Sequence, residues 1–318
     1  MAAMVLVLGF LVVALFADFL ASDQPILCHL NGKTYLLPNL FRDADLQDYD
    51  NQAVLDRIEH RGGWALFPPV PYGPLQSKVR GAIRWMGPPD RNHWLGTDDR
   101  GRDVLARLIH GTRISLAIGF VAVGIYTLIG LLLGALAGYY RDTLLDRLVS
   151  RLIEVMMSFP TFFLILAIQG LLTSSSVFQL MVVIGLTRWT DVARLVRGEV
   201  MRIGTQDYIT AARALGLSQA RIILRHVIPN AMGPVLVTAT FGVAGAVLIE
   251  SSLSFLGFGT PPPTASWGEL LTQAYHNGQP WWLTLFPGLA LFLLVTSYNL
   301  LGETLRDAFD PHLRQGAV

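Results

Sequence analysis

The sequence is poor in the residue types that redox, metal and nucleotide chemistry require. Cys28 is the only cysteine among 318 residues, which excludes an intrachain disulfide and a paired-cysteine metal or redox site. The seven histidines are scattered without the spacing of zinc ligands. No GxxxxGK(S/T) phosphate-binding loop occurs. We therefore predict that the chain is not an enzyme, does not hydrolyse ATP and binds no metal or cofactor.

Charge is scarce as well. Charged residues make up 15% of the chain and the net charge is +1, so the composition indicates no nucleic-acid partner. Hydrophobic residues make up 52% and the mean hydropathy is +0.46, which is too apolar for a soluble domain of this size. The composition therefore predicts a membrane protein that is surrounded by a lipid bilayer.

Long apolar stretches are abundant. A helix needs about 20 apolar residues to cross a bilayer, and backbone groups in lipid must be hydrogen-bonded internally. Six stretches predict an all-α polytopic membrane protein with six transmembrane helices, at 4–20, 114–139, 148–172, 177–195, 231–258 and 282–301. Residues 1–16 could also be a signal-peptide core, but they lack a positively charged n-region. We favour a retained helix at 1–21, whose N-terminus could extend beyond Met1.

The arginines predict the orientation of these helices. No lysine or arginine lies between Arg151 and Arg188, or between Arg225 and Arg306. Arginines cluster instead after the second, fourth and sixth stretches, and the positive-inside rule places those regions in the cytosol. Both termini are then cytosolic, including a tail at 303–318. The connections 173–176 and 259–281 and the polar segment that follows the first helix are external.

That external segment, at 22–92, predicts a small insert with some β structure. Four prolines between Pro68 and Pro74 favour extended and turn structure. The pair Asn31-Gly32 lies between apolar residues and is a hairpin signal.

Residues 93–112 predict an amphipathic helix at the membrane interface. Val104, Leu105, Leu108 and Ile109 share one face of this helix, and two arginines, Arg102 and Arg107, lie off it. The helix would lead into a transmembrane core at 113–302.

A polar, arginine-bearing segment at 206–230 interrupts the core. Gly216 can take the left-handed conformation that ends a helix and Ser218 can cap the next one, so two short helices meet at an angle. The small pair Ala211-Ala212 lets another protein approach closely. Pro229 cannot continue a helix without a break, which suits a turn back into the membrane. The alternative is an amphipathic connector on the lipid surface, with its arginines on headgroups.

The segment 206–230 resembles the EAA loop of the transmembrane subunits of bacterial ABC importers. That motif has E-A-A, three residues, glycine, nine residues and I-x-L-P. Here Thr210-Ala211-Ala212 precedes Gly216 at this spacing, and His226-Val227-Ile228-Pro229 ends the motif, with Thr in place of Glu and His in place of Ile. The resemblance implies a loop that couples the chain to an ATPase, through Asp207, Ala211, Ala212, Gly216, His226 and Pro229.

Three further stretches, 93–116, 254–271 and 300–311, look like the peptide/nickel branch of these permeases. The long insert is similar to that of the permease of the peptide importer that also admits microcin C. The family implies the type I ABC importer permease fold in the bacterial inner membrane, and half of a translocation pathway for peptides, or else for nickel complexes or opines. It also implies a sister permease, two cytosolic ABC ATPase subunits that use ATP, and an external substrate-binding protein.

Ionisable residues within the apolar stretches are candidates for function. Glu250 could face the translocation path and meet a substrate amine, or it could form a structural hydrogen bond with neighbouring serines. Pro160 could kink the third helix and shape the cavity, or be absorbed by packing. We expect Glu154 to pair with Arg151 or Arg147 on adjacent turns.

Two other function classes remain open. A secondary transporter would show internal repeats and broken midplane helices, and we find no convincing repeat. A membrane-anchored structural or receptor protein could use the insert, but the loop at 206–230 argues against it.

Overall fold

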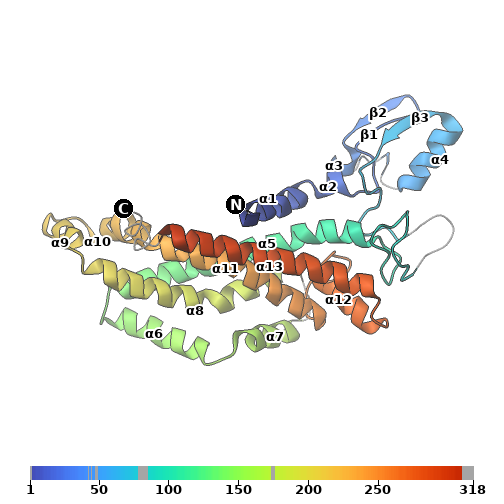
Figure 1. Ribbon diagram of the computed structural model, residues 1–318. Helices are drawn as coiled ribbons and strands as arrows, with labels where there is room; N and C mark the ends of the chain where they lie inside the picture. The colour runs from blue at the N-terminus through green and yellow to red at the C-terminus, as the bar shows by residue number, and fades with distance from the viewer. Residues whose placement is uncertain are drawn as a thin grey trace. The chain divides into compact units, whose positions relative to one another are not determined.

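A computed structural model describes the chain at residues 2–41, 43, 45–46, 49–77, 85–172 and 176–309. These residues are mostly helical, with a small sheet near the N-terminal end of the chain (Figure 1). The chain divides into two compact units, Met1–Ala117 with Glu250–Leu294, and Ile118–Ile249 with Val295–Val318.

Three helices of the described residues are long and apolar enough to cross a membrane. They are α5 (Val104–Tyr139), α11 (Ile228–Phe255) together with the helical turns before it, and α13 (Trp281–Phe309). They coincide with the second, fifth and sixth apolar stretches. Six such helices are not confirmed, because a fourth is reached only by counting a bent pair as one span.

The first and fourth stretches form helices that fall short in length or in apolar character. Helix α1 (Ala2–Leu15) is apolar but has 14 residues, fewer than the roughly 20 that a span needs. A four-residue helix, α2 (Ala17–Leu20), follows it after Phe16. Helix α8 (Val177–Gly204) has 28 residues, but arginines and acidic residues occupy its second half.

The third stretch consists of two helices, whereas a single continuous helix was predicted at 148–172. It consists of α6 (Leu144–Met157) and α7 (Thr161–Leu171), which meet at an angle of 82°. Pro160 precedes the first residue of α7. Proline lacks a backbone N–H and restricts the residue before it, so the α6 helix cannot continue through this position. Of the two alternatives for Pro160, this geometry supports the kink, which is a complete break of the helix.

The insert contains a three-stranded antiparallel sheet with strand order β2-β1-β3. The turn between β1 and β2 holds Asn31 and Gly32, both with positive φ (52° and 79°), which is where an Asn-Gly hairpin turn is expected. Buried Cys28 and Val54 belong to the small apolar core of this part. Its elements are β1 (Leu27–Leu30), β2 (Lys33–Leu36), α3 (Pro38–Phe41), α4 (Asn51–Arg61) and β3 (Gly63–Leu66).

No separate helix covers the described residues 93–112, which differs from the predicted interfacial helix. Residues 93–103 form turns and one isolated bridge, and α5 begins at Val104 and continues to Tyr139. The reason is local. The Asp103 carboxylate accepts a hydrogen bond from the backbone N–H of Ala106 at 2.7 Å, as a helix N-cap does.

The predicted connection 259–281 also contains structure. Helix α12 (Trp267–His276) lies within it, and Ser266 caps the helix by accepting a hydrogen bond from the backbone N–H of Glu269 at 3.3 Å. The Trp267 indole donates to the carbonyl of Leu108 at 3.0 Å, which attaches α12 to the first turns of α5.

Glycines let α5 pack closely against α8 in the second unit. A Cβ atom at Gly134 would lie 2.5 Å from the carbonyl oxygen of Ala193, and one at Gly138 would lie 2.6 Å from that of Arg197. Gly130 meets α8 in the same way one turn earlier. Small residues at every fourth position permit this approach of two backbones in membrane proteins.

Three short elements connect α8 to α11. They are α9 (Asp207–Ala214), α10 (Gln219–Ile222) and the π-helical turn η1 (Ile223–Val227). This part of the chain contains the segment 206–230.

Candidate functional site

The segment 206–230 folds as two short helices joined by a tight turn. Gly216 has φ of +76°, so it adopts the left-handed conformation predicted from the sequence. The N–H of Gly216 donates to the carbonyl of Arg213 at 3.0 Å, and that of Leu217 donates to the carbonyl of Ala212 at 3.2 Å. These two bonds form a Schellman motif, which ends α9 and satisfies its last carbonyls. Ser218 precedes α10 at the N-cap position, but its side chain makes no capping bond.

The segment has a buried side and an exposed side. Ile209, Ala212 and Ile222 are buried and form its inner packing. Two large apolar side chains are exposed, Leu215 at 81% and Leu224 at 65%.

The structure separates the alanine pair. Ala211 is exposed and Ala212 is buried, so the two do not share one outward face. Asp207, at the first position of α9, is exposed. Of the alanine pair, only Ala211 can therefore contribute to the expected docking surface, together with its exposed neighbours.

Pro229 does not break the helix, so that prediction is wrong. It lies in the first turn of α11, directly after the π-turn η1. Within this turn the N–H of Ile228 donates to the carbonyl of Ile223, five residues earlier. A π-turn changes the hydrogen-bond register by one residue, which accommodates a proline that lacks an N–H. His226 lies in this turn, and its carbonyl accepts a hydrogen bond from Asn230 at 2.6 Å.

Contacts with the last residue of α5 hold the segment in place. The Tyr139 hydroxyl hydrogen-bonds to Gln219, and the Arg213 guanidinium carbon lies 5.2 Å from the centroid of the Tyr139 ring. These contacts attach both α9 and α10 to the end of α5.

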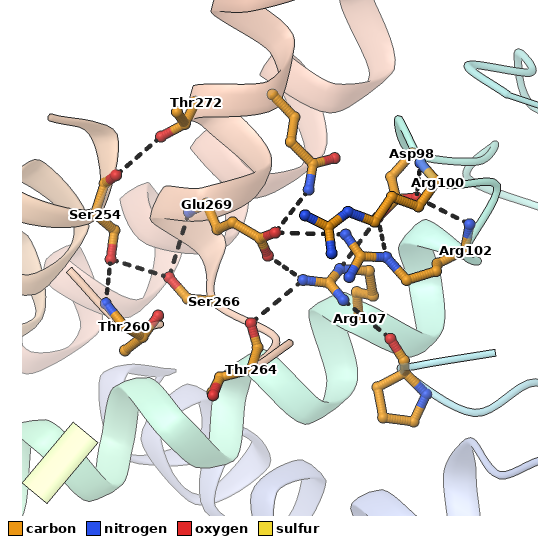
Figure 2. A network of polar contacts seen from close by, with 12 residues as sticks. Asp98, Arg100, Arg102, Arg107, Ser254, Thr260, Thr264, Ser266, Glu269 and Thr272 are labelled. Carbon is orange, nitrogen blue, oxygen red and sulfur yellow. Dashed lines mark hydrogen bonds and ion pairs between the residues drawn. The ribbon is translucent and has the colours of Figure 1, made fainter. Parts of the chain in front are cut away.

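A second candidate is a buried polar network in the first unit, built around Asp98, Arg102, Arg107 and Glu269 (Figure 2). Asp98 accepts from the Arg102 Nε at 2.7 Å and lies 3.4 Å from the Arg107 Nε. Glu269 of α12 pairs with both arginines. All but Glu269 are nearly inaccessible to solvent. Two positive and two negative groups balance, which is the condition for burying charge.

This network corrects the sequence interpretation of the two arginines. Arg102 and Arg107 were expected on the polar side of an amphipathic helix, but they are only 2% and 0% exposed. Next to them, burial and the Asp98 carboxylate raise the pKa of Asp99 above its usual range.

Glu250 is also completely buried, and its environment is structural. Its carboxylate accepts hydrogen bonds from Ser254 at 2.8 Å, Ser266 at 2.9 Å and Ser251 at 3.3 Å. Ser266 is the N-cap of α12, so Glu250 joins the end of α11 to the start of α12. Of the two hypotheses for Glu250, this geometry supports the structural one.

Comparison with known proteins identifies the family. Residues 130–315 match the model of the "binding-protein-dependent transport system inner membrane component" family. The chain belongs to this family. It is 37% identical over 307 residues to the inner membrane ABC transporter permease protein YejE of Escherichia coli K12, an alignment that covers 94% of this chain and 89% of YejE.

Two further matches agree with this membership. The dipeptide transport system permease protein DppC of Alkalihalophilus pseudofirmus is 36% identical over 252 residues, covering 79% of this chain and 82% of DppC. A subunit of the inward-facing MetNI methionine ABC transporter superposes with a TM-score of 0.54 at 22% identity, over 64% of this chain and 96% of that subunit. The chain therefore has the type I ABC importer permease fold and is a permease component of a binding-protein-dependent importer.

The two candidate sites differ in whether the family model matches them. The segment 206–230 lies inside the matched range, whereas Asp98, Arg102 and Arg107 precede it. In systems of this kind the ATPase is a separate subunit, and the secondary-transporter alternative is not favoured. The described residues contain no group of three or more His, Cys, Asp or Glu that could hold a metal ion.

The sequence missed the buried network but contained a signal for it. Four acidic or basic residues fall within 98–102, directly before an apolar helix, although such a helix needs only one capping residue. Their partner, Glu269, is more than 160 positions away and could not be identified without the fold.

Proposed function

We propose that this chain forms half of the path by which an ATP-driven importer carries peptides across the bacterial inner membrane. The substrate class is supported by the names of the relatives, one of which is a dipeptide permease. The other half of the path would come from a sister permease, and an external binding protein would deliver the substrate.

The orientation in this proposal follows the arginines. Both termini and the segment 206–230 face the cytosol, and the insert at 22–92 faces outward. Six crossings would require α1, the bent α6–α7 pair and α8 to complete the three long apolar helices. Charged α8 is compatible with a crossing if its polar side faces the path or a partner subunit.

The observation that carries the proposal is the exposed apolar surface of the segment 206–230. In our proposal Leu215 and its neighbours insert into a groove of an ATPase, and the two copies of this loop in the permease pair engage two ATPases. Closure of the ATPases then moves α8 and α11, between which the segment lies.

The test compares Gly216 with Gly204, the last residue of α8. A Cβ atom would meet no heavy atom within 4 Å at either Gly216 or Gly204, but only Gly216 has positive φ. We expect Gly216→Val to leave the complex assembled in the membrane and to lower uptake and binding-protein-stimulated ATP hydrolysis at least about tenfold, because a β-branched residue resists this conformation. Gly204→Val should retain both activities. Full coupling in Gly216→Val vesicles would contradict the proposed role of the turn.

A further inference from the structure

One face of α8 carries charged side chains that neither the segment 206–230 nor the buried polar network uses. These side chains form a row along α8. Three or four positions separate successive members of the row, which places them on one side of the helix. The row consists of the charged residues Arg188, Asp191, Glu199 and Arg202, with Leu195 between the two pairs. The neighbouring side of α8 is in close contact with α5.

Two cavities of the second unit lie along this row. The one beside Arg188 and Asp191 has a volume of about 130 Å³, and the one beside Glu199 has a volume of about 830 Å³. Thr238 and Phe241 of α11 line both cavities. The charged row of α8 therefore faces open space that it shares with α11.

Glycines in α11 make room for the side chains of the smaller cavity. A Cβ atom at Gly245 would lie 2.7 Å from an Arg188 guanidinium nitrogen, and one at Gly242 would overlap the hydroxyl of Tyr126. The Arg188 guanidinium carbon lies 5.8 Å from the centroid of the Tyr126 ring, within reach of a cation–π interaction. The position of Arg188 is thus built by α5, α8 and α11 together.

The row contains one satisfied pair and one unsatisfied pair. Arg202 donates to the Glu199 carboxylate from its Nε at 3.2 Å. Among the described residues, the side chains of Arg188 and Asp191 make no hydrogen bond or ion pair. Asp191 is exposed although it lies near the middle of a 28-residue helix. Ionisable groups in such positions of membrane proteins face a water-filled path or a partner, because contact with lipid is too costly.

We infer that Arg188 and Asp191 line the translocation path and bind the carboxylate and the ammonium group of a short zwitterionic peptide. Three residues along a helix correspond to a rise of about 4.5 Å, so the two side chains can reach both ends of one small molecule. Asp191 would accept hydrogen bonds from the amine, and Arg188 would donate to the carboxylate in a bidentate manner. The inference rests on the proposed function, since it specifies which side chains contact a peptide.

The spacing limits the size of the peptide that engages both groups. Each added residue of an extended chain moves the two termini apart by up to about 3.3–3.6 Å. A dipeptide can satisfy Arg188 and Asp191 at once, whereas a pentapeptide can reach only one of them. The contribution of this pair should therefore decrease with peptide length.

The experiment uses the complete transporter, with sister permease, ATPases and binding protein, in proteoliposomes. Uptake of dialanine and of pentaalanine is measured for the wild type, Asp191→Asn, Arg188→Gln and the exchanged double variant Arg188→Asp/Asp191→Arg. We expect each single variant to lower dialanine uptake about tenfold, the effect of losing a charge-assisted hydrogen bond. Pentaalanine uptake should fall less than about twofold, and the exchanged variant should recover part of the dialanine uptake. Each value is normalised to the wild type with the same peptide, so delivery by the binding protein cancels.

A matched control removes a pair with the same spacing elsewhere. Arg151→Gln and Glu154→Gln neutralise an exposed ion pair on α6, and uptake of both peptides should remain at the wild-type level. Equal losses for both peptide lengths, or no loss, in the α8 variants would overturn the inference and leave the proposed function intact. A wild-type transporter that imports neither peptide would instead overturn the proposed function, and the inference with it.

Discussion

Arg107 shows at the residue scale how this chain tolerates charge in its interior. Its guanidinium is completely buried in the first turn of α5, where it contacts Glu269, Asp98 and the carbonyl of Pro74 at 3.0 Å. A buried cation is costly without partners, and these partners come from three separate parts of the chain. Arg107 therefore joins the segment after the insert, the start of α5 and α12.

The contribution of this pairing can be measured by removing one charge without changing shape. Glu269→Gln is isosteric, so it leaves the packing in place but takes from two buried arginines their shared carboxylate. We expect it to destabilise the protein by roughly 3 kcal/mol, because breaking one side of a buried pair leaves uncompensated charge. The measurement is the thermal unfolding midpoint of the detergent-solubilised complex.

The control for Glu269→Gln is Asp45→Asn, which removes the partner of Lys33 from an exposed pair in the insert. Water screens such pairs, so this substitution should leave the unfolding midpoint unchanged. A Glu269→Gln midpoint equal to that of the wild type would show that the network does not stabilise the fold.

Local residue pairs could be predicted from the sequence, and distant ones could not. Arg151 and Glu154 are three residues apart, and their predicted ion pair is confirmed at 2.9 Å. A helical projection placed Arg102 and Arg107 outside the apolar face, because it contains no information on Glu269. The hydrogen bonds of Glu250 are an intermediate case. The bond from Ser251 could be predicted because Ser251 is the next residue, but the bond from Ser266 forms only because the chain folds back.

At the scale of elements, glycine and proline determine which apolar stretches are continuous. Pro160 ends α6 because no register change precedes it, whereas Pro229 is absorbed by the π-turn η1. From the sequence alone a break was predicted at Pro229, while Pro160 was open to either a kink or absorption by packing. Which proline interrupts a helix depends on the packing around it. Helix α12 was missed because its formation also depends on packing that the sequence does not show.

The contact of α5 with α8 gives a prediction at this scale. Gly134→Val should destabilise the protein by about 1–3 kcal/mol, since the added atoms would push against the backbone of α8. Gly124→Val is the matched control. Gly124 belongs to the same helix, and a Cβ atom there would meet nothing within 4 Å. Equal unfolding midpoints for the two variants would contradict close packing of α5 and α8 at Gly134.

The orientation of the whole molecule in the membrane is a prediction from the arginines, and single cysteines can test it. Burial and, to a smaller extent, Asp43 raise the pKa of the Cys28 thiol to about 11, so this buried native cysteine should not react at neutral pH. His276→Cys, at the exposed last residue of α12, should react with a membrane-impermeant thiol reagent in intact spheroplasts. Ser218→Cys should react only after the membrane is opened. The reverse pattern would invert the topology.

The insert is the part of the molecule whose role the family resemblance explains least. The alignment with YejE covers 94% of this chain, so it must include most of the insert. YejE therefore has a corresponding segment. Its own core and sheet make it a folded body rather than a linker. In the orientation predicted from the arginines, we expect this folded segment to contact the binding protein or the sister permease rather than an ATPase.

The structure supplies boundaries for removing the insert. The N–H of Ser22 donates to the carbonyl of Val70 at 3.1 Å, and that of Val70 donates to the carbonyl of Leu20 at 3.0 Å, so the two ends of the stretch 22–70, which contains the sheet, meet there. Residues 24–68 can therefore be replaced by a Gly-Ser-Gly linker without stretching the backbone, whereas a cut at Asn31 would leave β1 unpaired.

We expect the shortened chain to assemble and to hydrolyse ATP at the basal rate, while the binding protein no longer stimulates hydrolysis or uptake. A full-length chain with the same linker added at the hairpin turn after Gly32 is the control, because it retains the sheet. Undiminished stimulation would reduce the insert to a cap over the helix ends. Failure of the shortened chain to copurify with the sister permease would instead assign the insert to holding the two permeases together. The basal ATPase activity of an assembled complex does not depend on an external partner, so it separates a loss of stimulation from a loss of assembly.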